Sequence, residues 1–127
     1  MLGQARIGNI CYYVADLDRT ERFWRDVVGL PVQRVEDGDE AFLIASTAGG
    51  IDLIFFVREA RPGDSPIIVF TLEDGGIDDV AAALVDHGAT IVTPVSHAPG
   101  GWSGDYADPD GHVLSLYQPA EKPRRLG

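Results

Sequence analysis

The sequence predicts an α+β fold in which one order of elements occurs twice. Asp16 opens a predicted helix that ends at Gly29, and Asp74 precedes a second helix that ends at Gly88, so matching positions lie 58 and 59 residues apart. An apolar stretch precedes each helix and a Val-rich stretch follows it. Helices on one side of mostly antiparallel strands make an α+β domain. A half of about 60 residues buries little core alone, so we expect two paired halves with a site between them.

Eight stretches are predicted strands, most of them apolar and rich in β-branched or aromatic residues. They cover residues 7–14, 31–35, 41–46, 51–57, 66–72, 89–95, 102–107 and 112–117. Asp16 and Asp18 supply N-cap chemistry for the first helix, and Gly29 suits the left-handed residue that ends it. Its predicted apolar face carries Leu17, Thr20, Phe23, Trp24, Val27 and Val28. We expect one domain over residues 1–118, with modules at about 7–58 and 66–118, a linker at 59–65 and a disordered tail at 119–127.

The composition narrows the class of partner. The formal charge is −10, spread along the chain, which disfavours nucleic acid and favours a cationic ligand. No apolar run approaches the roughly 20 residues that span a bilayer, so we expect no membrane partner. The single cysteine, Cys11, excludes an internal disulfide and suggests a cytoplasmic location.

Four motifs in order carry a family resemblance: residues 9–16 (NICYYVAD), Phe23-Trp24 followed by residues 28–30 (VGL), the 78–88 helix, and residues 108–112 (DPDGH) before the last strand. With these motifs, residues 7–118 resemble the vicinal oxygen chelate superfamily of glyoxalases, bleomycin resistance proteins and extradiol dioxygenases. The resemblance implies two tandem βαβββ modules that curl into a mixed half-barrel sheet, with helices outside. It also implies a homodimer, and module swapping between chains is an open option.

The enzymes of that family hold a divalent metal with up to four side chains on the first and last strands of each module. The matching positions here are Asn9, Asp52, Ile67 and Ser115. One carboxylate with an amide, a hydroxyl and an isoleucine is a poor ligand set. Because the sequence departs from the family's ligand pattern at these positions, we expect a domain that holds no metal and no other cofactor.

Strand alternation extends those four positions into a predicted ligand-binding wall, because residues i, i+2 and i+4 share a face. A wall that is mainly apolar, with sparse polar points, is typical of a small-molecule pocket. Trp102, in the glycine- and proline-rich loop 96–101 or beside it, is a predicted lid or stacking platform. The predicted ligand-binding residues are Asn9, Cys11, Tyr13, Asp52, Ile54, Phe56, Ile67, Val69, Thr71, Trp102, Val113, Ser115 and Tyr117.

Two roles remain open for several of these side chains. Asp52 is either a pocket carboxylate or a strand-end residue paired with Arg58 or Arg61. If the protein is an enzyme, Asp52 is the candidate base, and Tyr13 or His97 the candidate acid. His87, at the predicted helix end, and His112, after a turn, suit structural roles.

The leading interpretation is a metal-free protein that sequesters a hydrophobic or aromatic small molecule, such as an antibiotic or another secondary metabolite. One alternative is a lyase, isomerase or dioxygenase that uses unorthodox metal ligands or acid–base residues. Another is a regulatory or subunit module. The sequence alone leaves open whether the protein is an enzyme.

Overall fold

The computed structural model describes residues 1–61 and 63–127. Pro62, within the predicted linker 59–65, lies outside the described residues. The chain divides into two compact units, which we call the N-terminal unit (Gly8–Ile67) and the C-terminal unit (Met1–Ile7 with Ile68–Gly127). The first seven residues therefore belong with the second half of the sequence, which the module boundaries at 7–58 and 66–118 did not anticipate.

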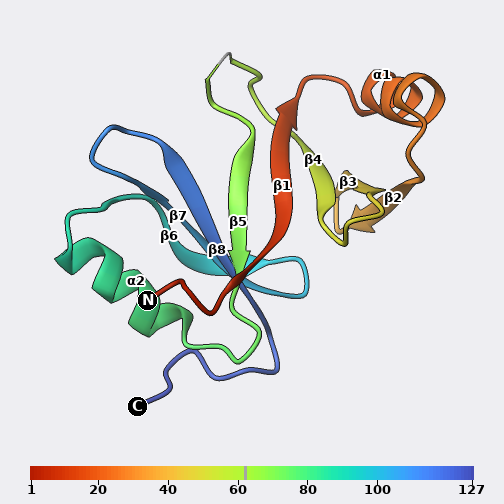
Figure 1. The fold of residues 1–127 in the computed structure, drawn as a ribbon. Helices are drawn as coiled ribbons and strands as arrows, with labels where there is room; N and C mark the ends of the chain where they lie inside the picture. Colours follow the sequence, from red (N-terminus) through yellow and green to blue (C-terminus); the bar gives the residue numbers. More distant parts are fainter. Residues whose placement is uncertain (62) are drawn as a thin grey trace. The chain divides into compact units, whose positions relative to one another are not determined.

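Each half of the chain follows the order strand, helix, strand, strand, strand, which confirms the predicted α+β class and its two βαβββ modules (Figure 1). The elements are β1 (Arg6–Val14), α1 (Leu17–Arg22), η1 (Phe23–Val28), β2 (Val32–Asp37), β3 (Glu40–Ser46), β4 (Asp52–Val57), β5 (Ile67–Thr71), α2 (Ile77–Asp86), β6 (Thr90–Ala98), β7 (Gly101–Ala107) and β8 (Val113–Pro119).

In the N-terminal unit the strands lie in the order β2-β3-β4-β1, with β1 and β4 parallel and the other neighbours antiparallel. Leu43, Ala45 and Phe55 form the buried core on one face of this sheet. Trp24 of η1 packs on this core, with its ring centroid 5.1 Å from that of Phe55. The helical segment therefore covers one face of the sheet.

The first helix begins as predicted and then changes its winding. The Asp16 carboxylate accepts a hydrogen bond from the Arg19 backbone N–H at 3.1 Å, which makes it the N-cap. After Arg22 the helix becomes the π-helical segment η1, and the Gly29 N–H donates to the Trp24 carbonyl. Gly29 ends it with φ 89°, as predicted.

The wider winding of η1 changes which side chains are buried. A π-helix bonds residue i to i+5, so the stripe expected from a 3.6-residue period rotates away from the sheet. Phe23, Val27 and Val28 were predicted on the packed face but are 51%, 71% and 45% exposed. Leu17, Thr20 and Trp24 remain buried or half-buried, as expected.

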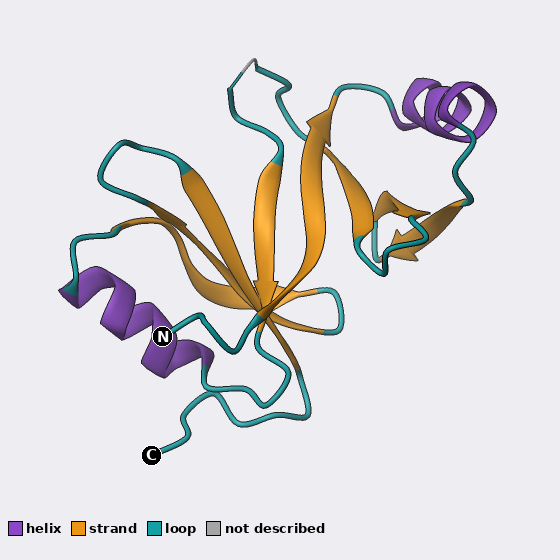
Figure 2. Cartoon of the chain, viewed as in Figure 1, coloured by secondary structure: helices purple, strands orange, loops and turns teal. Residues whose placement is uncertain are grey.

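The C-terminal unit has the strand order β5-β8-β7-β6, with β5 and β8 parallel and the other neighbours antiparallel. Its buried core contains Ile77 and Ala81 of α2 with Tyr106 and Leu116 from the sheet. Leu2 and Ala5, from the first residues of the chain, pack against this core. Figure 2 shows the N-terminus beside the helix of this unit. One face of this sheet is therefore covered by α2.

The last residues of the chain, in the predicted tail 119–127, bond to the start of α2. The N-cap of α2 is Gly76, which has φ 84° and no side chain to accept the first helical N–H groups. The chain end supplies the acceptors instead: Gly76 N–H donates to the Pro123 carbonyl at 2.8 Å, and Asp78 N–H to the Arg124 carbonyl at 3.0 Å. These bonds fix the tail because the start of a helix needs partners for its N–H groups.

Candidate functional site

The N-terminal unit brings six predicted ligand-binding residues onto one sheet face. Parallel pairing of β1 with β4 sets Asn9 opposite Asp52, Cys11 opposite Ile54 and Tyr13 opposite Phe56. Paired residues share a face, and the residues between them, such as Tyr12 and Phe55, belong to the face packed by α1 and η1. We call the face that carries Asn9, Asp52 and their partners the helix-free face.

Strand β3 widens this face with three residues that the sequence reasoning missed. Its register sets Ser46 opposite Asp52, Ile44 opposite Ile54 and Phe42 opposite Phe56. Alternation within the predicted 41–46 strand contained the signal, because residues 42, 44 and 46 share a face. The face thus has three rows. The polar row is Asn9, Asp52 and Ser46; the middle row is Cys11, Ile54 and Ile44; the aromatic row is Tyr13, Phe56 and Phe42.

The polar row contains a carboxylate, Asp52, that has no partner among the described residues. Asp52 is half-buried, and its side chain makes no hydrogen bond or ion pair with the residues that the structure describes. Arg61 pairs with Glu59 at 2.6 Å instead, and Arg58 lies over the Phe56 ring at 5.8 Å from the centroid. The pairing of Asp52 with Arg58 or Arg61, one of the two roles left open by the sequence, is therefore not formed.

The neighbouring amide has one polar contact along its own strand. The Cys11 thiol donates to Asn9 Oδ1 at 3.6 Å, so the Asn9 oxygen is turned toward the middle row. The Asn9 amide nitrogen and the Asp52 carboxylate lie on opposing positions of β1 and β4. The register therefore places an amide and a carboxylate on neighbouring strands at this end of the face.

In the C-terminal unit, the predicted residues on β5 and β8 also share a face. Val69 is opposite Ser115, and Thr71 is opposite Tyr117. Ile67, the first residue of β5, belongs to the N-terminal unit and is buried. Val113 is half-buried, and by alternation along β8 it extends the face that carries Ser115.

The polar groups of this face are bonded within the C-terminal unit. The Ser115 hydroxyl donates to the Gly104 carbonyl at 3.3 Å, and the Tyr117 hydroxyl donates to the Pro99 carbonyl at 2.8 Å. Burial raises the pKa of the Tyr117 phenol, which remains protonated at neutral pH. These side chains therefore contribute shape to the C-terminal unit more than unsatisfied hydrogen-bonding groups.

Two predicted residues, Trp102 and His97, lie on the other face of this sheet. Strand β6 extends to Ala98 and β7 starts at Gly101, so the expected mobile loop 96–101 is mostly a hairpin. Trp102 pairs with Gln118 in register and packs on the core that contains α2, while the His97 ring stacks on it at 4.0 Å between centroids. Trp102 and His97 therefore lie on the face packed by α2, opposite to the face that carries Ser115.

The family's metal does not fit the residues present. Asn9 and Asp52 do lie together, but Ile67 has no donor atom and the Ser115 hydroxyl is bonded to Gly104. Within residues 1–61 and 63–127, no three His, Cys, Asp or Glu side chains form a group able to hold a metal ion. One carboxylate and one amide are too few ligands for a divalent ion.

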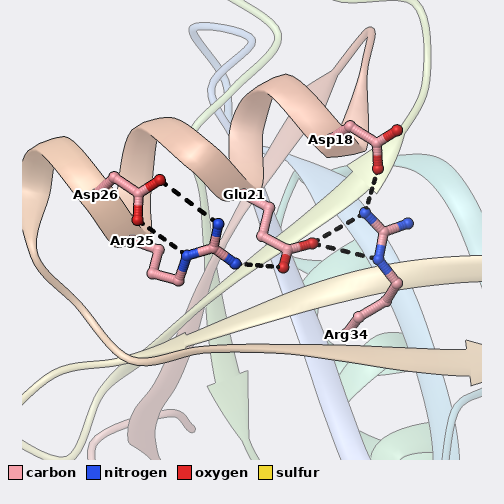
Figure 3. Close-up of polar contacts among 5 residues, drawn as sticks. All are labelled: Asp18, Glu21, Arg25, Asp26 and Arg34. Atoms are coloured by element: carbon pink, nitrogen blue, oxygen red, sulfur yellow. Dashed lines mark hydrogen bonds and ion pairs between the residues drawn. The ribbon is translucent and has the colours of Figure 1, made fainter.

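The most prominent charged cluster lies elsewhere on the N-terminal unit (Figure 3). Arg34 of β2 bonds Asp18 at 2.7 Å and Glu21 at 2.9 Å, while Arg25 bonds Glu21 at 2.8 Å and Asp26 at 3.0 Å. The bond from Arg25 lowers the pKa of Asp26. These charges satisfy one another at the surface, so the cluster holds α1 and η1 to β2 and leaves little for a ligand.

The remaining histidines make backbone contacts. His87 Nδ1 lies 2.8 Å from the Ala83 carbonyl at the end of α2, as expected of a residue that completes a helix. The His112 backbone N–H donates to Asp108 Oδ1 at 2.9 Å in the turn before β8.

Among the described residues, no helix is long and apolar enough to cross a membrane.

Several solved structures share this fold. Methylmalonyl-CoA epimerase from Streptomyces coelicolor is 20% identical with a TM-score of 0.68, and covers 91% of this chain and 97% of its own. A glyoxalase/bleomycin resistance protein/dioxygenase superfamily member from Vibrio splendidus 12B01 is 18% identical, with a TM-score of 0.61 and coverage of 91% and 99%. 2,2',3-Trihydroxybiphenyl 1,2-dioxygenase from Sphingomonas wittichii strain RW1 is 19% identical with a TM-score of 0.59, and the match covers 88% of this chain and 41% of the dioxygenase chain.

At these identities the similarities show the fold alone. No curated protein sequence matches the chain. The family model for the Glyoxalase/Bleomycin resistance protein/Dioxygenase superfamily matches residues 6–116, which span both βαβββ modules and every strand except the end of β8. The chain is a member of the Glyoxalase/Bleomycin resistance protein/Dioxygenase superfamily.

Proposed function

We propose that this protein binds a hydrophobic or aromatic small molecule on the helix-free face of the N-terminal unit, without a metal ion. The observation that carries the proposal is the register of β1, β4 and β3, which gathers an aromatic row, a middle row and a polar row on one face. Apolar area there supplies affinity, and a few polar groups fix the orientation of the ligand.

The aromatic row suits a flat ligand. The Phe42 and Phe56 rings lie 5.3 Å apart between centroids and are tilted by 37°, and Tyr13 occupies the next position across β1. Aromatic rings give a large apolar area and prefer offset or edge contacts with another ring. We expect the ligand to be an antibiotic or another secondary metabolite, and the working form to be a cytoplasmic homodimer.

An enzymatic role is the alternative, since the fold is shared with an epimerase and a dioxygenase. The acid–base pair suggested by the sequence gains no support from the geometry. Tyr13 lies four residues along β1 from Asn9, the partner of Asp52, which is about 13 Å. A base and an acid that act on one reacting group both need hydrogen-bond reach to it. We therefore favour binding.

The proposal is tested by a thermal-shift screen of aromatic natural products against the protein and two variants. We expect at least one compound to raise the melting temperature of the wild type, and Phe56→Ala to weaken its affinity roughly ten- to hundredfold, the value of burying one aromatic ring. Phe23→Ala is the matched control, because Phe23 is 51% exposed on η1 and should leave binding unchanged.

Two results would overturn this proposal. One is a panel in which no compound stabilises the wild type, or in which Phe56→Ala and Phe23→Ala bind equally well. The other is about one tightly held metal ion per chain in protein purified without an affinity tag, lost in Asp52→Ala. That outcome would support a lyase, isomerase or dioxygenase with unorthodox ligands.

A further inference from the structure

The helix-free face has opposite charges at its two ends, in the direction of its strands. Asp52 stands in the polar row, and the Arg58 guanidinium lies over the Phe56 ring in the aromatic row, 5.8 Å from its centroid. Asp52 and Phe56 are four residues apart on β4, which is about 13 Å in an extended strand. A negative group therefore marks one end of the face and a positive group marks the other.

The Arg58 and Asp52 side chains differ in their hydrogen bonds and in their exposure to solvent. Arg58 donates to the Val57 carbonyl at 2.7 Å and is exposed to solvent. Asp52 is half-buried and has no hydrogen bond or ion pair with any described residue outside its strand ladder. A partly buried carboxylate gains most from a cation that also donates hydrogen bonds.

Arg58 determines which end of the face accepts that cation. A second positive group placed beside Phe56 would be repelled by the guanidinium, whereas the same group beside Asp52 would be attracted. The neighbouring Asn9 and Ser46 add uncharged hydrogen-bonding groups to the polar row.

We propose that the ligand is an elongated amphiphilic cation, which lies along β1 and β4 with its basic nitrogen at Asp52 and its aromatic or apolar end on Phe56, whose ring packs on the buried Phe42. This inference rests on the proposed binding function and adds the ligand's charge and its direction on the face. Ligands of this class are aromatic or aliphatic amines and guanidines in which several bonds separate the basic group from the ring.

Three probes that differ only at one end test the charge. They are phenyloctylamine, phenyloctanol and phenyloctanoate, used below the concentrations at which they form micelles. We expect calorimetry to show the amine binding about tenfold more tightly than the alcohol, as one charge-assisted hydrogen bond provides, and the carboxylate most weakly. The preference for the amine should shrink as salt is added, because a half-buried pair is partly screened.

Asp52→Asn tests the residue, and Asp39→Asn is its control. Asp39 lies exposed in the turn between β2 and β3, so its substitution makes the same change in net charge away from the face. Asp52→Asn should bring the amine and the alcohol to equal affinity with alcohol binding retained, while Asp39→Asn keeps the tenfold preference. Retention of alcohol binding also shows that the variant is folded.

Shorter probes test the direction in which the ligand lies along the face. Phenylethylamine and phenylethanol are too short to reach both rows, so with the ring on Phe56 we expect them to bind equally. A tenfold preference for phenylethylamine would contradict the proposed orientation.

The outcomes separate this inference from the proposed function. Equal binding of phenyloctylamine and phenyloctanol, both weakened by Phe56→Ala, would overturn the cation and leave the binding function standing. An amine preference that survives in Asp52→Asn would likewise overturn it. Failure of all three long probes to bind overturns the cationic ligand, and the natural-product screen then decides the proposed function separately.

Discussion

Single residues decide how each helix begins. The sequence repeat aligns Asp16 with Asp74, yet only Asp16 acts as an N-cap. Gly76 caps α2 with a left-handed backbone and no side-chain bond, and the Gln118 side chain accepts the Ile77 N–H at 2.9 Å from across the C-terminal unit. The two helix starts of the repeat therefore differ: α1 has a side-chain N-cap, whereas an N–H group at the start of α2 bonds to the side chain of a distant residue.

Asp16 makes a prediction about acid. The Arg19 N–H bond lowers the pKa of Asp16 from its usual 3.8. A lowered folded-state pKa stabilises the fold above the usual pKa, and this stabilisation is lost as the pH falls through the folded value. Asp16→Ala should therefore reduce the free energy of unfolding at pH 7, and the difference from wild type should shrink in strong acid.

The measurement is urea unfolding of both proteins from neutral to strongly acidic pH. Asp39→Ala serves as the control, because Asp39 is an exposed carboxylate in a turn and caps no helix. A difference between Asp16→Ala and wild type that stays constant through the acid range would contradict the cap as a charged acceptor.

At single positions, the sequence predicted which residues share a face where a strand alternates regularly. Asn9, Cys11 and Tyr13 share a face with Asp52, Ile54 and Phe56, because period-2 alternation and pairing depend on local pattern. Trp102 lies beside the predicted loop, in the predicted 102–107 strand, but it pairs with Gln118 on the face packed by α2. The sequence pattern assigned no face to this strand, so the side on which Trp102 lies could not be predicted.

At the scale of elements, local pattern predicted where each helix and strand occurs but not how η1 winds or where the tail docks. The change to π-helical bonding exposes Val27 and Val28, and no period in the sequence signals it. The tail has no periodicity, and what orders it is the unsatisfied start of α2, which a distant segment completes. Such long-range partners cannot be read from local propensity.

The tail makes a second prediction. Arg124 bonds Asp78 at 2.9 Å and stacks over Trp102 at 4.2 Å from the ring centroid, so it fastens the chain end to α2 and β7. A double-mutant cycle with Arg124→Ala and Asp78→Ala should give a coupling energy of about 1 kcal/mol, since the pair is only partly exposed.

The control cycle uses Arg61→Ala and Glu59→Ala, a pair whose side chains are 63% and 74% exposed. Urea unfolding should give a coupling close to zero for it. If the Arg124–Asp78 coupling is no larger than this control, the tail contact adds nothing to the stability of the C-terminal unit.

At the scale of the whole molecule, the chain contains the βαβββ module twice. In each unit a helical element covers one sheet face, while the predicted ligand-binding residues, apart from Trp102, lie on the other. The internal repeat made the doubled βαβββ order predictable. The docking of residues 1–7 with the C-terminal unit was not, because Leu2 and Ala5 pack on a core supplied by residues far along the chain.

The two faces differ in what they leave for a ligand. In the C-terminal unit the Ser115 and Tyr117 hydroxyls bond to carbonyls of their own unit. In the N-terminal unit Asp52 has no such partner among the described residues. The proposed binding function therefore centres on the N-terminal unit, whose rows combine aromatic area with a carboxylate that has no partner among the described residues.

The most direct test of this account is to map the bound ligand by NMR. The compound that stabilises the protein most would be titrated into isotope-labelled protein while the backbone amide shifts are followed. We predict that the largest changes fall within Arg6–Val14, Glu40–Ser46 and Asp52–Val57, the strands of the helix-free face. Changes confined to the C-terminal unit, or to the ion-pair cluster of Asp18, Glu21, Arg25, Asp26 and Arg34, would contradict the proposed binding face.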